Sequence, residues 1–321
     1  MNLKFGVIGV GEMGKNHARV YHELGVLKAI SDIDKEKERQ HARKFGCEYY
    51  KDYIEMIEEE DLDGVSVCVP TFLHHEVSMD LLEKGINLLV EKPISDEVKK
   101  AKEMIRVSRK NKAILMIGHI ERFNPIVRKI KELKNELGKI LSITTKRVGP
   151  FPHRVKDASV LIDLAVHDID VMLYLCESDV MDVKFFGENY FDDRRCDYAT
   201  ALLKFSDGVI GNIETSWITP VKVRKINVLG KKGSCEGDYI LQTLKFWDTF
   251  VSREYDDFSD LVLKFSGGDA KEVYIEKEEP LKLELEHFID CVKNKNEPEV
   301  NGESGLKVLE VIEKMKDKEE G

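Results

Sequence analysis

The sequence lacks several features that would place it in a specialised class of protein. Its six cysteines are scattered and none forms a CxxC pair, which argues against a disulfide framework and against a zinc knuckle. No apolar run is long enough to span a bilayer, and the first residues run directly into a strand pattern without a cleavable apolar region. We therefore expect a soluble, cytoplasmic protein with reduced thiols and no membrane partner.

The chain also has fewer basic than acidic residues. The 50 Lys and Arg residues are outnumbered by 60 Asp and Glu residues, and the net charge of −10 argues against general affinity for nucleic acid. The 321 residues are 42% hydrophobic, which is enough to build two domains with real cores. We find no internal repeat and no low-complexity tract.

Short apolar runs alternate with amphipathic segments in the first third of the chain. The strand-like runs are 3–9, 26–31, 64–69, 86–90 and 113–118, and the helical patterns lie near 12–24, 35–45, 52–59, 73–84 and 96–110. Continuous apolar strands separated by helices imply a parallel sheet that is covered on both faces. We predict an α/β fold whose first domain, residues 1–119, is a doubly wound Rossmann domain.

The pattern changes after about residue 120, where longer strands alternate between apolar and polar residues. An Asp207-Gly208 turn joins two such strands, and residues 222–240 form another hairpin candidate. The helical patterns here lie near 123–137, 161–175, 281–294 and 302–317. We predict a second α/β domain over residues 120–321, with a large, mainly antiparallel open sheet.

A glycine pattern, GxGxxG, follows the first strand-like run and opens the first helix. Glycine at these positions permits the tight turn, the approach of a pyrophosphate to the backbone, and close helix packing, and the helix amino terminus then stabilises the anion. We predict that this segment binds a dinucleotide. Its residues are Gly9, Gly11, Glu12, Met13 and Gly14.

An acidic residue, Asp32, ends the second strand-like run. A carboxylate there can bind the ribose 2′-hydroxyl and would repel a 2′-phosphate, and no arginine follows nearby. We therefore predict NAD as the cofactor in preference to NADP. The alternative interpretation is a solvated acid at a strand end.

Two further strand-like runs end in polar residues, and open α/β sheets bind ligands at that edge. Pro70, Thr71 and His74 follow the third run, and Glu91 and Lys92 end the fourth. We expect all five beside the cofactor, where a lysine can donate to a substrate oxygen. The alternatives are a capping or surface histidine and an ordinary solvated lysine.

The stretch LIDLAVHDID (161–170) places ionisable side chains in an otherwise apolar helix. Asp163, His167 and Asp170 fall at i, i+4 and i+7, which is one face of the helix. Buried charge is expensive unless it is paired or used. An Asp/His pair can also ligate a metal, but no third ligand stands at a matching local spacing, so we predict no metal.

These motifs together resemble the Gfo/Idh/MocA oxidoreductase family. The resemblance rests on GxGxxG, EKP (91–93), GHIERFNP (118–125) and DLAVHDID (163–170), in this order, and it covers essentially the whole chain. It implies NAD(P)-dependent oxidation or reduction of sugars and related polyols. It also implies a second domain whose open sheet often forms the oligomer interface.

The resemblance assigns roles to individual residues. It makes Lys92 the catalytic lysine, Asp163 and His167 the DxxxH pair, and the Lys92–Pro93 bond cis. A sugar hydroxyl that gives up a hydride from its carbon must also lose a proton, and histidine is suited to accept it near neutral pH. We expect His167 to be the general base, with Asp163 orienting it, and we expect Asp168 and Asp170 to be structural.

The regions around the second-domain helix look like the branch of the family that acts on nucleotide sugars, such as UDP-N-acetylglucosamine. The reaction expected there is oxidation of the 3-hydroxyl. Arginines placed just before this helix could bind a diphosphate, although each could also be a solvated loop charge. The predicted substrate-binding residues are Lys92, Arg122, Asn124, Arg147, Arg154, Asp163 and His167.

Two alternatives stay open at this point. One is a free-sugar or inositol dehydrogenase on the same scaffold, and the other is an NAD-binding regulatory protein that has lost catalysis. We expect a homodimer or homotetramer, because the long strands of the second domain should leave one sheet face apolar and uncovered.

Overall fold

The computed structural model describes residues 3–34, 42–151, 159–191, 195–248 and 270–319. The chain divides into two compact units, one formed by Met1–Phe123 with Glu279–Glu310 and the other by Asn124–Glu278 with Val311–Gly321. The division differs from the predicted one, because residues 279–310 were assigned to the second domain and lie in the first unit.

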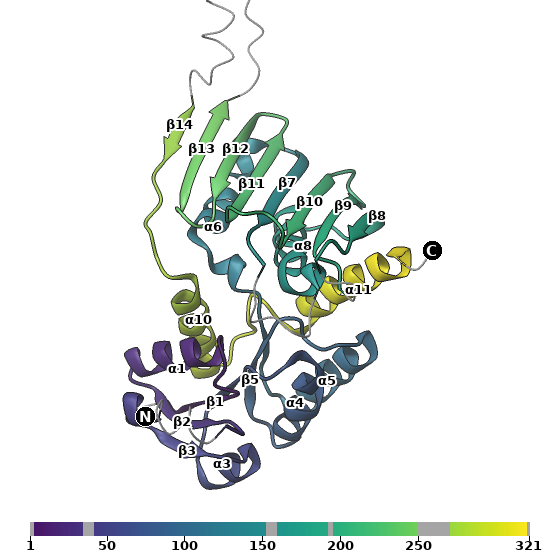
Figure 1. The fold of residues 1–321 in the computed structure, drawn as a ribbon. Coiled ribbons are helices and arrows are strands. Elements are labelled where there is room, and N and C mark those ends of the chain that lie inside the picture. Colours follow the sequence, from purple (N-terminus) through teal and green to yellow (C-terminus); the bar gives the residue numbers. More distant parts are fainter. Residues whose placement is uncertain (1–2, 35–41, 152–158, 192–194, 249–269, 320–321) are drawn as a thin grey trace, which may run out of the picture. The chain divides into compact units, whose positions relative to one another are not determined.

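The first unit contains a six-stranded parallel sheet in the order β3-β2-β1-β4-β5-β6. Its strands are β1 (Phe5–Ile8), β2 (Leu27–Ser31), β3 (Glu48–Tyr50), β4 (Gly64–Val67), β5 (Asn87–Glu91) and β6 (Leu115–Gly118). Its helices include α1 (Gly14–Glu23), α3 (Tyr53–Glu59), α4 (His74–Glu83), α5 (Val98–Asn111) and α10 (Pro280–Asn294). Figure 1 shows α1 and α10 on one side of this sheet and α4 and α5 on the other. The predicted doubly wound fold is confirmed.

One strand of this sheet was missed. β3 has three residues, none of them buried, and it pairs in parallel with the end of β2. A run this short carries no apolar pattern that distinguishes it from a loop. Most of the helix predicted at 35–45 lies outside the described residues.

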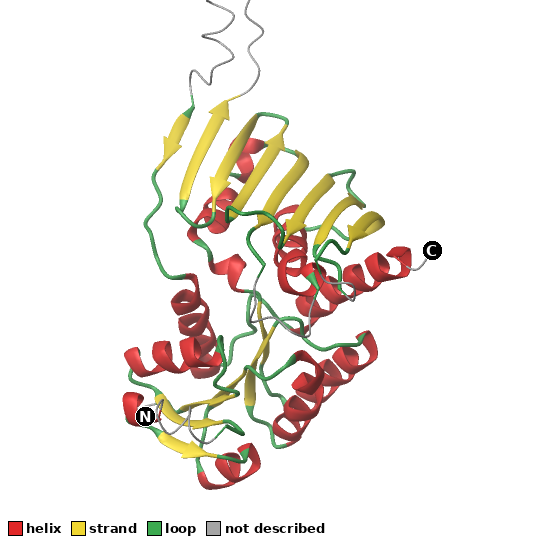
Figure 2. Ribbon diagram, viewed as in Figure 1, coloured by secondary structure: helices red, strands yellow, loops and turns green. Residues whose placement is uncertain are grey.

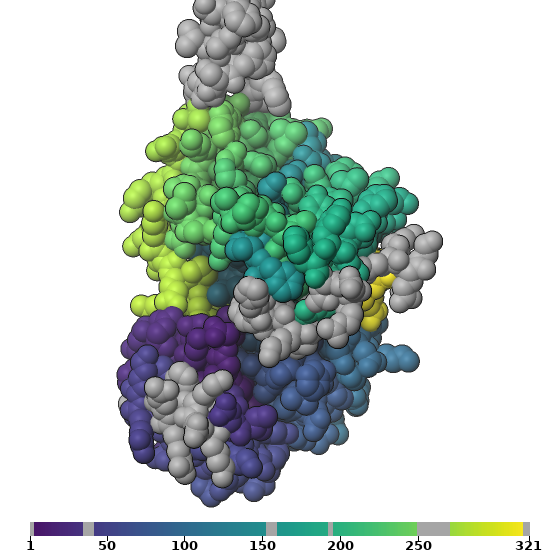
Figure 3. Space-filling model, viewed as in Figure 1, coloured from purple at the N-terminus to yellow at the C-terminus, as the bar shows by residue number. Residues whose placement is uncertain are grey.

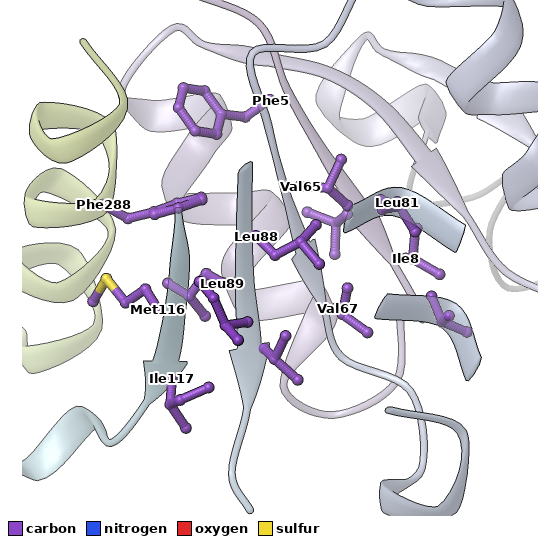
Figure 4. Close-up of a cluster of buried hydrophobic side chains, with 14 of the residues drawn as sticks. Phe5, Ile8, Val65, Val67, Leu81, Leu88, Leu89, Met116, Ile117 and Phe288 are labelled. Atoms are coloured by element: carbon purple, nitrogen blue, oxygen red, sulfur yellow. The ribbon is translucent and has the colours of Figure 1, made fainter. Parts of the chain in front are cut away.

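Helix α10 completes the core of the first unit. Leu281, Leu285 and Phe288 recur at i, i+4 and i+7 and are buried, and the Phe288 ring lies 5.6 Å from that of Phe5 on β1. Figure 4 shows Phe288 beside Phe5 and Met116 in this core. Each side chain of this size contributes about 1.5–3 kcal/mol when fully buried. This packing is the physical reason why the segment belongs to the first unit.

The second unit contains an eight-stranded sheet in the order β14-β13-β12-β11-β7-β10-β9-β8. Its strands are β7 (Ile140–Val148), β8 (Val180–Glu188), β9 (Tyr198–Phe205), β10 (Ile210–Ser216), β11 (Val223–Gly230), β12 (Gly233–Asp238), β13 (Thr243–Asp248) and β14 (Lys271–Val273). All neighbours are antiparallel except β7 and β10. Both predicted hairpins are present, and Gly208 adopts the positive φ of +92° in the first of them.

The helices of the second unit differ in detail from the prediction. The segment 123–137 forms α6 (Pro125–Glu132) and α7 (Lys134–Leu137). The segment 161–175 begins as a π-helical turn, η3 (Leu161–Ala165), and continues as α8 (Val166–Cys176). Helix α11 (Gly302–Glu319) begins in the first unit and ends in the second. None of the helices in the described part of the chain combines the length and the apolar content that crossing a bilayer requires.

One face of the second sheet is exposed. Buried and accessible residues alternate along β9 and β10. Figure 2 shows the strands of this sheet, and Figure 3 shows atoms of the same region, teal to yellow-green, at the surface. Phe186, Leu202 and Ile210 are 73%, 49% and 42% exposed. Polar side chains lie among them, including ion-paired Lys146 and Glu214, so this face is less apolar than predicted.

Candidate active site

The three glycines of GxGxxG each meet a different steric demand in the turn between β1 and α1. Gly9 has φ +83°, and a Cβ atom on Gly14 would lie 1.8 Å from the carbonyl oxygen of Gly9. A Cβ on Gly11, in contrast, would meet no atom of the described residues within 4 Å. The turn is therefore closed on the protein side and open at Gly11, which fits the approach of a pyrophosphate to the backbone.

Asp32 lies directly beside this turn. Its carboxylate accepts a hydrogen bond of 2.7 Å from the backbone N–H of Val10 and one of 3.1 Å from that of Asp34. The side chain is half-buried, as a ribose-binding acid must be to remain within reach of a ligand. Of the other predicted residues in the turn, Glu12 is exposed and pairs with Lys15, and Met13 is half-buried.

The loop after β4 places Pro70 at the surface and Thr71 in a half-buried position at the start of a 3-10 turn. His74, which begins α4, is fully buried. Its Nδ1 lies 2.8 Å from the carbonyl oxygen of Pro93, and its Nε2 lies 2.9 Å from that of Val69. Burial lowers the pKa of His74, although both carbonyl contacts act in the opposite direction. Both ring nitrogens of His74 therefore contact backbone carbonyl oxygens, whereas we predicted that His74 contacts the cofactor.

Lys92 stands at the carboxyl end of β5 and is partly exposed. The Lys92–Pro93 bond is cis, as predicted. The preceding Glu91 is buried, and its carboxylate accepts from the backbone N–H of Lys92 and contacts Nε2 of His17 at 2.9 Å. Burial alone would raise the pKa of Glu91, but the His17 contact and the charge of Lys92 hold it below its ordinary value.

Sequence reasoning missed His17. It lies on α1 three residues after Gly14, completely buried, and the spacing GxGxxGxxH was the available signal. His17, Cys68 and Glu91 are also the one group in the described residues whose possible metal ligands all lie within 4.8 Å of one another. Both ring nitrogens of His17 already have hydrogen-bond partners, so we interpret the group as a hydrogen-bond network.

The Asp163–His167 pair lies where η3 passes into α8, in the second unit. Both side chains are partly exposed, whereas Asp168 and Asp170 are completely buried. A π-helical turn widens the backbone spiral and occurs often at functional sites. The two side chains that were predicted to do chemistry are thus accessible in part, although Nδ1 of His167 is itself buried.

Arg147, predicted as a diphosphate ligand, is buried in a different arrangement. Its Nε and Nη2 donate to Asp168 at 3.0–3.1 Å, and its guanidinium carbon lies 5.0 Å from the centre of the Tyr239 ring. The guanidinium is thus bound by a carboxylate and packed on an aromatic ring, which differs from the predicted contact with a diphosphate. The expected structural role of Asp168 is confirmed.

Two more predicted substrate ligands have structural partners. Arg122 is buried and donates to the carbonyl oxygen of Glu299. Asn124 is buried at the amino terminus of α6, where its side chain accepts from Ile126 and donates to the carbonyl oxygen of Tyr239. These contacts differ from the predicted substrate role. Arg154 lies outside the described residues.

Family models match both halves of the chain. A model described as "Oxidoreductase family, NAD-binding Rossmann fold" matches residues 3–119, and a "GFO/IDH/MocA C-terminal domain" model matches residues 127–236. The first match covers the glycine turn, Asp32 and Lys92, and the second covers Asp163 and His167.

Characterised relatives of similar length match nearly the whole chain. A UDP-N-acetylglucosamine 3-dehydrogenase of Acidithiobacillus ferrooxidans is 26% identical over 96% of this chain and 95% of its own. A myo-inositol 2-dehydrogenase of Thermotoga maritima is 29% identical over 96% of this chain and 93% of its own.

Solved structures share the fold over the full length. The crystallised UDP-N-acetylglucosamine 3-dehydrogenase of A. ferrooxidans superposes with a TM-score of 0.89 at 24% identity, covering 99% of this chain and 97% of its own. A levoglucosan dehydrogenase complexed with NADH and levoglucosan has a TM-score of 0.86 at 19% identity, with coverage of 99% and 97%. At these identities the likeness shows the fold alone.

Proposed function

Because the chain belongs to the Gfo/Idh/MocA oxidoreductase family and has its NAD-binding Rossmann domain, we propose that it oxidises a secondary hydroxyl of a sugar. The specific substrate that we propose is a UDP-N-acetylhexosamine such as UDP-N-acetylglucosamine, oxidised at the 3-hydroxyl. The observation that carries the reaction type is the accessibility of Lys92, Asp163 and His167 among buried neighbours. The 26% identical UDP-N-acetylglucosamine 3-dehydrogenase supports the substrate.

The proposed chemistry follows from what these side chains can hold or move. His167 takes the hydroxyl proton, and Lys92 donates a hydrogen bond to the same oxygen, which lowers the cost of its developing negative charge. Asp163 orients the imidazole of His167. The glycine turn and Asp32 would hold NAD, which when bound would supply the acceptor for the hydride, so that the alcohol would be oxidised to a ketone and its hydroxyl proton would pass to His167.

A free-sugar or inositol dehydrogenase is the second candidate, and the 29% identical myo-inositol 2-dehydrogenase favours it. The regulatory alternative ranks lower, because the lysine and the Asp/His pair that such a protein can lose are present.

We also propose that the protein works in a reducing, cytoplasmic setting. The six cysteines, none of which is in a disulfide, support this proposal.

A substrate panel tests the proposal. With NAD in excess, NADH formation at 340 nm should be fastest by kcat/KM on UDP-N-acetylglucosamine or UDP-N-acetylgalactosamine. N-acetylglucosamine without the nucleotide, glucose and myo-inositol should be much poorer substrates. Faster oxidation of myo-inositol than of any nucleotide sugar would transfer the assignment to the second candidate.

Asp32 should set the cofactor preference. We expect NADH to bind more tightly than NADPH, and Asp32→Ala to lose about 1.5–3 kcal/mol of NADH affinity, the range of a hydrogen bond to a charged group. Asp34→Ala is the matched control, since its backbone N–H, and not its side chain, contacts Asp32. Fluorescence titration with both cofactors measures this, and tighter binding of NADPH by the natural protein contradicts it.

The exposed face of the second sheet is the proposed contact between copies of the chain. We expect a dimer or tetramer in light scattering at micromolar concentration, because Phe186, Leu202 and Ile210 place apolar area on an open face. The double variant Phe186→Lys, Leu202→Lys should shift the population towards monomer, while Asn135→Lys, at an exposed position of α7 and not on the sheet face, should not. A monomeric natural protein would rule this out.

A further inference from the structure

A line of hydrogen-bonded side chains runs through the first unit to the backbone of Lys92. Tyr21 Oη lies 2.8 Å from Ser66 Oγ, which lies 3.1 Å from His17 Nδ1. His17 Nε2 lies 2.9 Å from Glu91 Oε1, and the backbone N–H of Lys92 donates to Glu91 Oε2 at 3.2 Å. The line links α1, which starts at the glycine turn, to the carboxyl end of β5.

These polar side chains are buried in the core, and burying them costs free energy. Tyr21, Ser66 and His17 are completely buried and Glu91 is 7% exposed. A Cβ atom on Gly118, the neighbour of Glu91 across β5 and β6, would lie 3.3 Å from the Glu91 carboxyl group. The neighbouring strand therefore leaves room for a carboxylate where an apolar side chain would be cheaper to bury.

The backbone around Lys92 is held on its other side by a second histidine. The carbonyl oxygen of Pro93 contacts Nδ1 of His74, whose other ring nitrogen contacts the loop after β4. Lys92 thus stands between two buried histidines, one acting on its N–H through Glu91 and one acting on the carbonyl that follows. Its own side chain is the part that remains accessible.

We propose that His17 and Glu91 are positioning residues for Lys92. The pair fixes the backbone on which Lys92 stands, and it keeps a negative charge beside the lysine ammonium. His17 belongs to the helix that opens at the dinucleotide turn, so the pair also ties that helix to the lysine. This inference rests on the proposed role of Lys92 in the reaction.

The charge of Glu91 depends on its partner. With His17 and Lys92 beside it, the pKa of Glu91 is lowered in spite of burial, so the group is ionised at neutral pH. If His17 is removed, the charge and the backbone N–H of Lys92 still favour the carboxylate, but burial has the largest effect and favours the protonated form, so the pKa of Glu91 should rise. The ionisable groups whose charges act on Glu91, or on which it acts, are His17 from α1, Cys68 after β4, His74 on α4 and the adjacent Lys92.

The test compares Glu91→Gln, His17→Gln and His17→Leu with Tyr21→Phe, which cuts the line at its far end. Residues that orient a working group in metal sites are typically worth about 10–100-fold in activity, and we expect a similar loss of kcat for Glu91→Gln with little change in NADH affinity. The loss should appear in kcat much more than in KM, because a displaced lysine ammonium stabilises the developing charge on the reacting oxygen less well. Tyr21→Phe should lose stability only, with the pH profile of the natural protein.

The two His17 variants separate positioning from simple packing. His17→Gln can still donate to Glu91 and should keep most of the turnover. His17→Leu should gain an acidic limb in its kcat profile, since a buried Glu91 without its histidine partner takes up a proton more readily. Gly118→Ala keeps every hydrogen-bonding group and crowds Glu91, so it should lower kcat several-fold even if the other variants fold poorly.

The proposal is overturned if Glu91→Gln and Gly118→Ala both keep the kcat and the pH profile of the natural protein. The pair is then a core hydrogen bond and nothing more. Lys92→Ala is measured in parallel. If it keeps full turnover, the proposed reaction mechanism fails, whatever the His17 and Glu91 variants do.

Discussion

Replacing His167 with Asn is expected to lower kcat on the best substrate by about 10²–10⁴, the range for loss of a positioned base. Asparagine keeps a polar side chain of similar size but cannot take the hydroxyl proton. NADH affinity should survive, because the glycine turn and Asp32 lie in the first unit and His167 in the second. Lys92→Ala should show the same loss of turnover with retained NADH binding.

Stopped-flow reduction of NAD and fluorescence titration of NADH measure the two quantities separately. His75→Gln is the control histidine, since its Nε2 pairs with Glu103 on α5 and we give it no role in the reaction. Near-natural turnover of His167→Asn would mean that His167 is a polar residue of the helix without a part in the chemistry.

The second large effect is expected at the glycine turn, where two neighbouring substitutions should fail for different reasons. A methyl group on Gly14 would stand 1.8 Å from the Gly9 carbonyl oxygen, so Gly14→Ala must displace the turn or the start of α1. Overpacking of this kind costs about 1–3 kcal/mol, and so close a contact belongs at the upper end. Both the melting temperature and NADH affinity should fall.

Gly11→Ala is the matched variant, because a methyl group there has no neighbour within 4 Å in the part of the chain that the structure describes. The melting temperature should therefore stay near its natural value. NADH affinity should still drop by about tenfold, or about 1.4 kcal/mol, because the methyl stands where the pyrophosphate approaches. Calorimetry with and without NADH separates the two cases. Full NADH affinity in Gly11→Ala would place the pyrophosphate elsewhere.

Local patterns were sufficient for most of the fold. The continuous apolar runs that became β1, β2, β4, β5 and β6 and the Asp207-Gly208 hairpin carry their signal within a few residues. The apolar stripe of α10 predicted a helix with a buried face but could not name its partner, Phe5, which lies far away in the sequence. The domain assignment of residues 279–310 depended on that partner.

The residues of the candidate site also fall into those that a local motif predicts and those that depend on a distant partner. The backbone of the glycine turn and the place of Asp32 beside it could be predicted from local motifs, whereas the cis Lys92–Pro93 bond was expected only from the family resemblance. Arg147 was not, because an arginine on a loop and an arginine buried against a carboxylate look alike until the partner, Asp168, is known. His17 was missed for a related reason, since it lies on helix α1 and its partner Glu91 ends β5, far away in the sequence.

The late arrival of α10 has a consequence for how the protein is made. On the ribosome, residues 1–123 emerge long before the helix that covers Phe5, and the 155 residues of 124–278 must be translated between them. At typical rates of about 5–20 residues per second, the nascent Rossmann sheet waits roughly 8–30 s with that part of its core uncovered. During this interval the chain is a natural client for chaperones, and a translational pause between residues 124 and 278 would lengthen the exposure.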